Sequence, residues 1–219
     1  MKIVEICDEN RAKFMPCIAQ LAHEAFPPCE LIAPFCVDEL SEAEFEHLVA
    51  VEDGQFLGFA SIRRWQNLAY LAFLAVNFNA RNSGVGAQIL NALTNKFADA
   101  IVVAEIENPY ENCCDDEKEL RKRRLKFYER NGFCQSGYFI SYCGVCYEII
   151  YFSSSRGAKN DKFDYLYNGK CDLANIDAIG HDFKMMFDEF SNGGKFEFKC
   201  EKSKFFKKNA FSPKSFSLI

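Results

Sequence analysis

The chain has 219 residues, of which 49% are hydrophobic, and its formal net charge is −5. This length accommodates one domain with a substantial core plus a small appendage, and the apolar share argues against general disorder. The negative charge of the whole chain disfavours nucleic acid and anionic lipid as partners.

The first residues and the cysteines bear on the compartment. Asp8 and Glu9 interrupt the first apolar stretch before a secretory signal could form, and no apolar run reaches the ~20 residues of a membrane helix. We therefore expect a cytoplasmic protein with no membrane partner, and reduced thiols at its 11 cysteines. Cys143 and Cys146 have a metal-like spacing, but no second pair is well placed, so we expect no metal.

The first third of the chain predicts a strand, two helices and a hairpin. Pro27 and Pro28 end the first helix, and Asp53-Gly54 between two apolar runs is typical of a tight hairpin turn. The predicted elements are a strand over 2–6, an amphipathic helix over 11–25, a weaker helix over 37–45, and hairpin strands over 47–52 and 55–63.

Strands and helices then alternate. Residues 116–119 resemble a capping box, and Gly132 predicts a left-handed helix end. The predicted elements are a strand over 69–76, a helix over 86–97, a strand over 101–106, a helix over 116–130, and strands over 137–142 and 146–152. This order predicts an α/β domain with a mixed sheet.

A change of composition divides the chain near residue 153, where a run of serines begins. We predict one domain over 1–153 and an appendage over 154–219, with a helix at about 177–190 and a Lys/Phe-rich tail after it. Basic and aromatic residues interleave in this tail, as in some nucleic-acid-binding segments. The acidic whole chain favours a final strand or helix laid on the domain instead.

A glycine-containing loop lies between the strand that ends at Val76 and the next helix. Its sequence is Arg81-Asn82-Ser83-Gly84-Val85-Gly86. The N–H groups at a helix start are unpaired and carry partial positive charge, and glycines let a diphosphate approach them closely. The arginine adds a charge-assisted contact. The loop therefore predicts a pyrophosphate site, and it fits neither the dinucleotide fingerprint nor the P-loop.

The pattern Arg-x-x-Gly-x-Gly after an apolar strand resembles motif A of the GNAT acetyltransferase superfamily. Residues 126–133, ending in Asn131-Gly132-Phe133, resemble its motif B, and the resemblance covers roughly 1–153. It implies a GNAT-like, mostly antiparallel mixed sheet flanked by helices, with acetyl-CoA as co-substrate. The residues it implies for cofactor binding are Leu74, Ala75, Val76, Arg81, Asn82, Ser83, Gly84, Val85 and Gly86.

The resemblance also implies acetyl transfer to a primary amine by direct attack in a ternary complex, with Tyr128 as the acid that protonates the thiolate. Glu105 and Glu107 alternate on one strand, so their side chains are expected on the same side of it. Both are candidate bases, because an acidic residue at the end of that strand can receive a proton through water. Glu30 is a candidate contact for the amine. The alternative interpretations are that Tyr128 is a core residue that anchors its helix, and that Glu105 and Glu107 face solvent or form salt bridges. A non-catalytic acyl-CoA-binding module remains the rival function, and exposed edge strands allow a homodimer.

Overall fold

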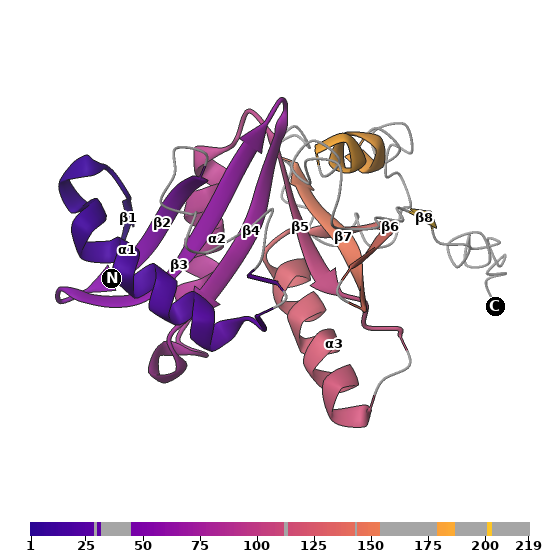
Figure 1. The fold of residues 1–219 in the computed structure, drawn as a ribbon, viewed down its shortest axis with the longest axis horizontal. Helices are drawn as coiled ribbons and strands as arrows, with labels where there is room; N and C mark the ends of the chain where they lie inside the picture. The colour runs from indigo at the N-terminus through magenta and orange to yellow at the C-terminus, as the bar shows by residue number, and fades with distance from the viewer. Residues whose placement is uncertain are drawn as a thin grey trace, which may run out of the picture.

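The structure, a computed structural model, describes residues 1–28, 30–31, 45–111, 114–142, 144–153, 179–186 and 201–202. A helix over 179–186 carries no label in Figure 1. The labelled elements are β1 (Lys2–Glu5), α1 (Asp8–Ala25), β2 (Phe45–Glu52), β3 (Gln55–Trp65), β4 (Leu68–Val76), η2 (Phe78–Ala80), α2 (Val85–Lys96), β5 (Ile101–Glu107), α3 (Asp115–Arg130), β6 (Cys134–Tyr142), β7 (Val145–Ser153) and β8 (Glu201–Lys202).

The described strands form one 8-stranded sheet in the order β1-β2-β3-β4-β5-β7-β6-β8. Neighbouring strands run antiparallel except β4 and β5, which are parallel. The predicted mixed, mostly antiparallel sheet flanked by helices is therefore confirmed (Figure 1).

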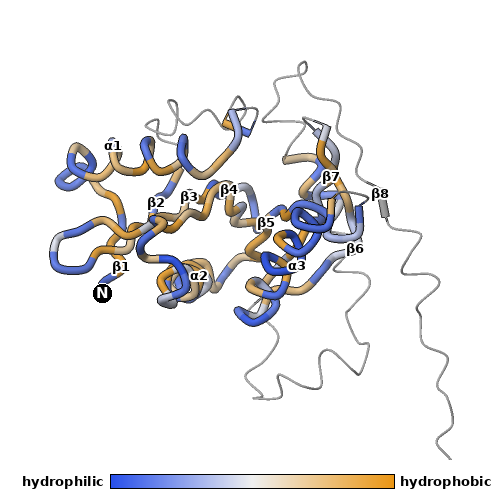
Figure 2. The backbone as a smooth tube through the Cα atoms, turned by 90° about the horizontal axis from the view of Figure 1, so that it is seen from below, coloured by the Kyte–Doolittle hydropathy of each residue, from blue (hydrophilic) through white to orange (hydrophobic). Residues whose placement is uncertain are grey.

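Helices cover both faces of the sheet. α1 lies on one face, and α2 and α3 lie on the other (Figure 2). On the α1 face, Phe14 and Ile18 of the helix pack with Tyr70 and Ile149 of the sheet. The helix over 179–186 adds its buried side chains to this same cluster. On the α2–α3 face, apolar residues of both helices pack against alternate residues of the strands.

β4 and β5 separate halfway along their length. Pairing joins Leu68–Leu71 of β4 only to Ile101–Ala104 of β5. Beyond Leu71, β4 still pairs with β3, and beyond Ala104, β5 still pairs with β7. The two parallel strands therefore diverge toward their C-terminal ends, as Figure 1 shows, and we call this opening the splay.

Several helix boundaries differ from the predictions for local reasons. α1 begins at Asp8, earlier than expected, because the Cys7 N–H donates to Asn10 Oδ1 at 3.0 Å and caps the first turn. The capping box expected at 116–119 is wrong, because Cys114 is the N-cap of α3 and makes no side-chain cap bond. Three acidic residues in the first turn of α3 instead stabilise the helix start, because their negative charge lies near the positive end of the helix dipole.

The C-terminal predictions are only partly covered by the described residues. The helix expected at 177–190 is helical over its described part, 179–186. Glu201–Lys202 pairs with β6 as a short final strand, and the rest of the tail lies outside the described residues. The helix expected over 37–45 also lies outside them, except for Phe45, which begins β2.

Candidate active site

The glycine loop places a helix start at the end of β4. Gly84 is the N-cap of α2 with φ 87, and Asn82 also has a positive φ of 62. The first hydrogen bond of the helix runs from the Gln88 N–H to the Gly84 carbonyl at 3.1 Å. In the described part of the chain, the N–H groups of residues 85–87 therefore have no backbone partner and are available to an anion.

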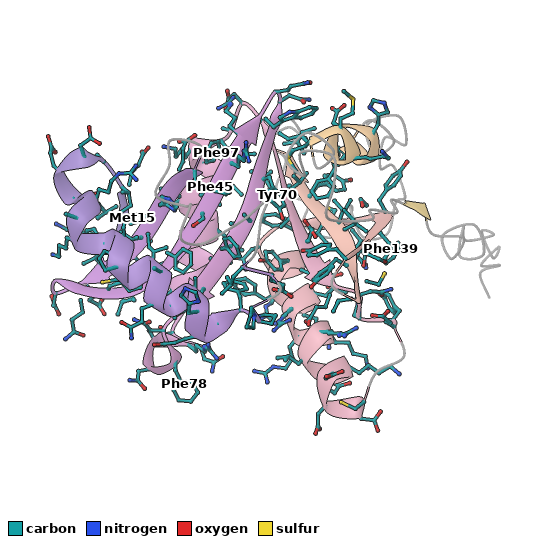
Figure 3. The ribbon with its side chains drawn as sticks, in the orientation of Figure 1. Met15, Phe45, Tyr70, Phe78, Phe97 and Phe139 are labelled. Atoms are coloured by element: carbon teal, nitrogen blue, oxygen red, sulfur yellow. The ribbon has the colours of Figure 1, made fainter. Side chains whose placement is uncertain are left out.

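Arg81 ties this loop to the strand. Its Nε donates to the Val76 carbonyl at 3.2 Å, and its guanidinium lies 5.6 Å from the Phe78 ring centroid. Phe78 is 80% exposed, and Figure 3 shows it at the loop end of β4. The guanidinium thus stands at the same end of the sheet as the free N–H groups, which suits a diphosphate.

The two sequence motifs meet at Gly86. A Cβ built on Gly86 would stand 3.2 Å from the Phe127 ring and 3.6 Å from Val76 Cγ2. The start of α2, the end of α3 and the end of β4 are therefore in close contact. At Gly84, by contrast, a Cβ would meet nothing within 4 Å, so the backbone there is open to a ligand.

Tyr128 lies near the end of α3 on the α2–α3 face. The rings of Phe127 and Phe133 each approach its ring edge-on with centroids 5.3 Å apart. Burial raises the pKa of Tyr128 to about 12. Among the described residues its hydroxyl has no hydrogen-bond partner, so this hydroxyl is protonated and free to donate.

Glu105 is the first residue of β5 beyond its pairing with β4. The Tyr70 hydroxyl donates to Glu105 Oε1 at 2.7 Å. Burial raises the pKa of Glu105 to about 7, while hydrogen bonds from Tyr70 and Tyr142 act in the opposite direction. Its Oε2 is buried and accepts no hydrogen bond of ordinary geometry from the described residues. This carboxyl can therefore take up or release a proton near neutral pH.

Glu30 reaches the same region from the segment after α1. The Tyr147 hydroxyl donates to Glu30 Oε1 at 2.6 Å, and the Tyr142 and Tyr147 rings stack with centroids 4.5 Å apart. The charge of Glu30 also raises the pKa of Glu105. The structure thus brings two predicted site residues together with three tyrosines, and we call Glu30, Tyr70, Glu105, Tyr142 and Tyr147 the acidic–aromatic cluster.

These three tyrosines could not be predicted from the sequence as site residues, because each lies in an apolar strand and resembles an ordinary core residue. The alternating pattern of β5 also predicts Glu107 as a candidate base alongside Glu105. In the structure Glu107 makes an ion pair with Arg124 of α3, whereas Glu105 faces Tyr70 on the α1 face. The two glutamates therefore have different partners, and only Glu105 belongs to the acidic–aromatic cluster.

The described part of the chain contains 5 of the cysteines, Cys7, Cys17, Cys114, Cys134 and Cys146, and none of them forms a disulfide. Within the same residues, no group of three or more His, Cys, Asp or Glu side chains could hold a metal ion. None of the described helices combines the length and apolar character needed to cross a membrane.

The comparisons with known proteins agree with this architecture. Residues 43–135 match the family model described as Acetyltransferase (GNAT) domain. No curated protein sequence matches the chain. The match begins just before β2 and ends at the start of β6, so it includes the glycine loop, the splay and Tyr128. Residues 43–135 therefore resemble a GNAT acetyltransferase domain.

Solved structures extend the likeness of fold beyond the matched segment. A putative GNAT-family acetyltransferase from Bacteroides thetaiotaomicron has a TM-score of 0.58 at 20% identity, covering 87% of this chain and 99% of that one. An aminoglycoside 6'-N-acetyltransferase from Enterococcus faecium has a TM-score of 0.56 at 16% identity, covering 70% and 97%. An aminoglycoside 6'-N-acetyltransferase complexed with coenzyme A has a TM-score of 0.53 at 16% identity, covering 69% and 96%.

Proposed function

We propose that the protein is an N-acetyltransferase that moves an acetyl group from acetyl-CoA to a primary amine by direct attack in a ternary complex. The observation that carries this proposal is the free helix start at Gly84, which lies at the end of the sheet where β4 and β5 diverge. The coenzyme A complex of a structurally similar enzyme supports acetyl-CoA as the donor.

The proposed donor site uses residues of both motifs. The N–H groups of residues 85–87 and Arg81 bind the pyrophosphate, because both present positive charge at the loop end of β4. The segment Leu74–Val76 lies beyond the point where β4 leaves β5, so its backbone can lie along the pantetheine arm. A backbone N–H near Val76 would polarise the thioester carbonyl, as in an oxyanion hole.

The proposed acid and base lie on opposite faces of the splay. Glu105, on the α1 face, accepts a proton from the amine as the new C–N bond forms. The C–S bond then breaks, and Tyr128 on the other face donates its proton to the leaving thiolate. Glu105 suits the role of base better than Glu107, because Glu107 is already paired with Arg124. The Tyr147 hydroxyl holds Glu30 near Glu105, and in this proposal the negative charge of Glu30 attracts the incoming ammonium group.

Thiol release from acetyl-CoA with a panel of amines tests the activity, and calorimetry with CoA tests the donor site separately. We expect Gly84→Asn to weaken CoA binding at least about tenfold, because its side chain fills the open approach while Asn still tolerates positive φ. Gly54→Asn is the matched control, since Gly54 has φ 80 and is equally open, but lies in the hairpin turn.

Each outcome has a distinct meaning. Unchanged CoA affinity in a folded Gly84→Asn protein would remove the donor site from the loop. Tight CoA binding without thiol release for any amine would instead favour a binding module over an enzyme. Loss of stability in both glycine variants to the same extent would measure the backbone strain that they share.

A further inference from the structure

The helix over 179–186 lies outside the segment that matches the GNAT domain, yet it is built into the core. Ile179, Phe183 and Met186 are exposed by 2%, 0% and 0%. Their spacing places them on one side of the helix. Eight helical residues are marginal by themselves in water, so burial of these side chains against the sheet contributes to holding them in place.

Because Gly180 has no side chain, the helix backbone can pack directly against the Tyr138 ring of β6. A Cβ on Gly180 would stand 2.6 Å from Cε1 of the Tyr138 ring, closer than real Cβ contacts come. Gly180 and Ile179 are both buried, whereas His181 is exposed and its Nδ1 lies 3.6 Å from Asp182 Oδ1. The helix therefore turns Ile179, Phe183 and Met186 toward the sheet, while His181 and Met185 face away from it.

Phe183 connects this helix to the acidic–aromatic cluster. Its ring packs edge-on against Tyr70, with centroids 5.6 Å apart and an interplanar angle of 74°. Tyr70 is 3% exposed, and its hydroxyl is the group that donates to Glu105. Figure 3 shows Tyr70 where β4 and β5 run side by side, and the helix over 179–186 at that end of the sheet.

We propose that Phe183 is a positioning residue of the acceptor site, because its ring holds the Tyr70 hydroxyl on the Glu105 carboxyl and keeps water away from both. This inference rests on the proposed function of Glu105 as the base. It assigns to a helix outside the matched domain one wall of the site that receives the amine. Phe183 itself touches no reacting atom, and it acts through Tyr70.

The electrostatic surroundings of Glu105 make the inference measurable. Burial is the largest cause of the raised pKa of Glu105, and hydrogen bonds from Tyr70 and Tyr142 lower it. The charge of Glu30 raises the pKa of Glu105, and the Tyr147 hydroxyl donates a hydrogen bond to Glu30. Burial is a larger cause than the Tyr70 hydrogen bond, so water admitted by a cavity at Phe183 should lower this pKa even if that hydrogen bond is lost at the same time.

The experiment follows the side-chain carboxyl carbon of Glu105 by NMR through a pH titration of the full chain, labelled at glutamate, with Glu105→Gln used to assign the signal. In Phe183→Ala we expect the pKa of Glu105 to fall by about one unit or more toward its ordinary value. Met185→Ala is the matched control in the same helix, because Met185 is 45% exposed, and it should leave this pKa unchanged.

A purely structural Phe183 would give another result. Phe183→Ala would then lower the melting temperature, and the pKa of Glu105 would stay within about 0.3 unit of the wild-type value, which would overturn the inference. Phe183→Leu keeps a buried side chain without the ring. If the alanine variant does not fold, this variant should show a smaller fall of the same sign, and an unchanged pKa would equally count against Phe183.

The titration needs no turnover, so its outcome is independent of the proposed activity. Where an amine is turned over, the rising limb of kcat/KM against pH should move to lower pH in Phe183→Ala by the same amount as the NMR titration. A pKa that falls in a protein that acetylates no amine would retain the positioning role and reject the transferase function.

Discussion

Tyr128 is the residue at which mechanism and packing are most easily separated. Its hydroxyl has no hydrogen-bond partner among the described residues, while its ring is held by Phe127 and Phe133. Tyr128→Phe therefore removes only the proposed proton donor. We expect kcat and kcat/KM to fall together by roughly 10²–10⁴-fold, with acetyl-CoA affinity nearly unchanged. Steady-state kinetics decide this, and a variant within about threefold of wild type would exclude Tyr128 as the acid.

Glu105 leads to a prediction about pH. A general base must be ionised to accept a proton, and the pKa of Glu105 is raised to about 7. We therefore expect kcat/KM to rise with pH through about 7, and Glu105→Gln to abolish most of the activity. Glu107→Gln is the control, because it breaks a partly exposed pair with Arg124 and should cost at most about 1 kcal/mol of stability. Equal losses of activity in both variants would contradict the choice of Glu105.

At the scale of elements, the contact between β6 and the helix over 179–186 is tight enough to test with one methyl group. Gly180→Ala places its Cβ against the Tyr138 ring, so either this ring or the helix must shift. We expect a loss of about 1–3 kcal/mol in the free energy of unfolding, as for other overpacked sites. Faster amide hydrogen exchange at 179–186 would show that this helix is the part that opens. Wild-type exchange there in a destabilised variant would place the strain elsewhere.

For the whole molecule, the pH dependence of stability reflects carboxyls that are buried and neutral. Glu148 of β7 is 0% exposed, Gln135 donates to its Oε2 at 2.7 Å, and its Oε1 lacks a partner among the described residues. Burial raises the pKa of Glu148 to about 7. The folded state therefore binds this proton more tightly than the unfolded chain does, and the resulting stability is complete below the unfolded pKa and lost as pH rises through about 7.

Glu148→Gln should remove this dependence, because an amide of similar size has no proton to lose. Urea unfolding at about pH 5 and pH 8 is the measurement. We expect the difference in stability between wild type and variant to change by on the order of 2–3 kcal/mol between these pH values, with the wild type relatively weaker at the higher pH. A difference that does not vary with pH would mean that Glu148 titrates normally.

The proposed boundary near residue 153 is also a whole-molecule question. Three buried side chains of 179–186 pack on the α1 face, and each contributes about 1.5–3 kcal/mol by area. We therefore expect a chain ending at Ser155 to be markedly less stable while its glycine loop still binds CoA if it folds. Thermal unfolding with and without CoA measures both properties. A melting temperature equal to that of the full chain would show that residues 1–153 need no appendage.

Local sequence determined the features whose partners are near neighbours. Asp53 and Gly54 adopt φ values of 49 and 80, as their hairpin turn requires, and Gly132 ends α3 with φ 88. The Gly84 helix start follows in the same way from residues 81–86. Such features need only a few consecutive residues, so one sequence was enough to predict them. The capping box at α3 failed at this same scale, because the chain entered the helix at Cys114, earlier than the pattern indicated.

The tertiary structure alone decided where β4 and β5 part and what gathers at that point. Tyr70 and Glu105 lie 35 positions apart in the chain, and Phe183 reaches Tyr70 from the appendage. Glu105 and Glu107 alternate on one strand, yet one meets tyrosines and the other an arginine of α3. Strand register, helix placement and burial set these contacts and the pKa of Glu105, and all three are products of the completed fold. The sequence identifies the side chains that could take part in a reaction. Only folding brings distant side chains together and removes the water that surrounds them.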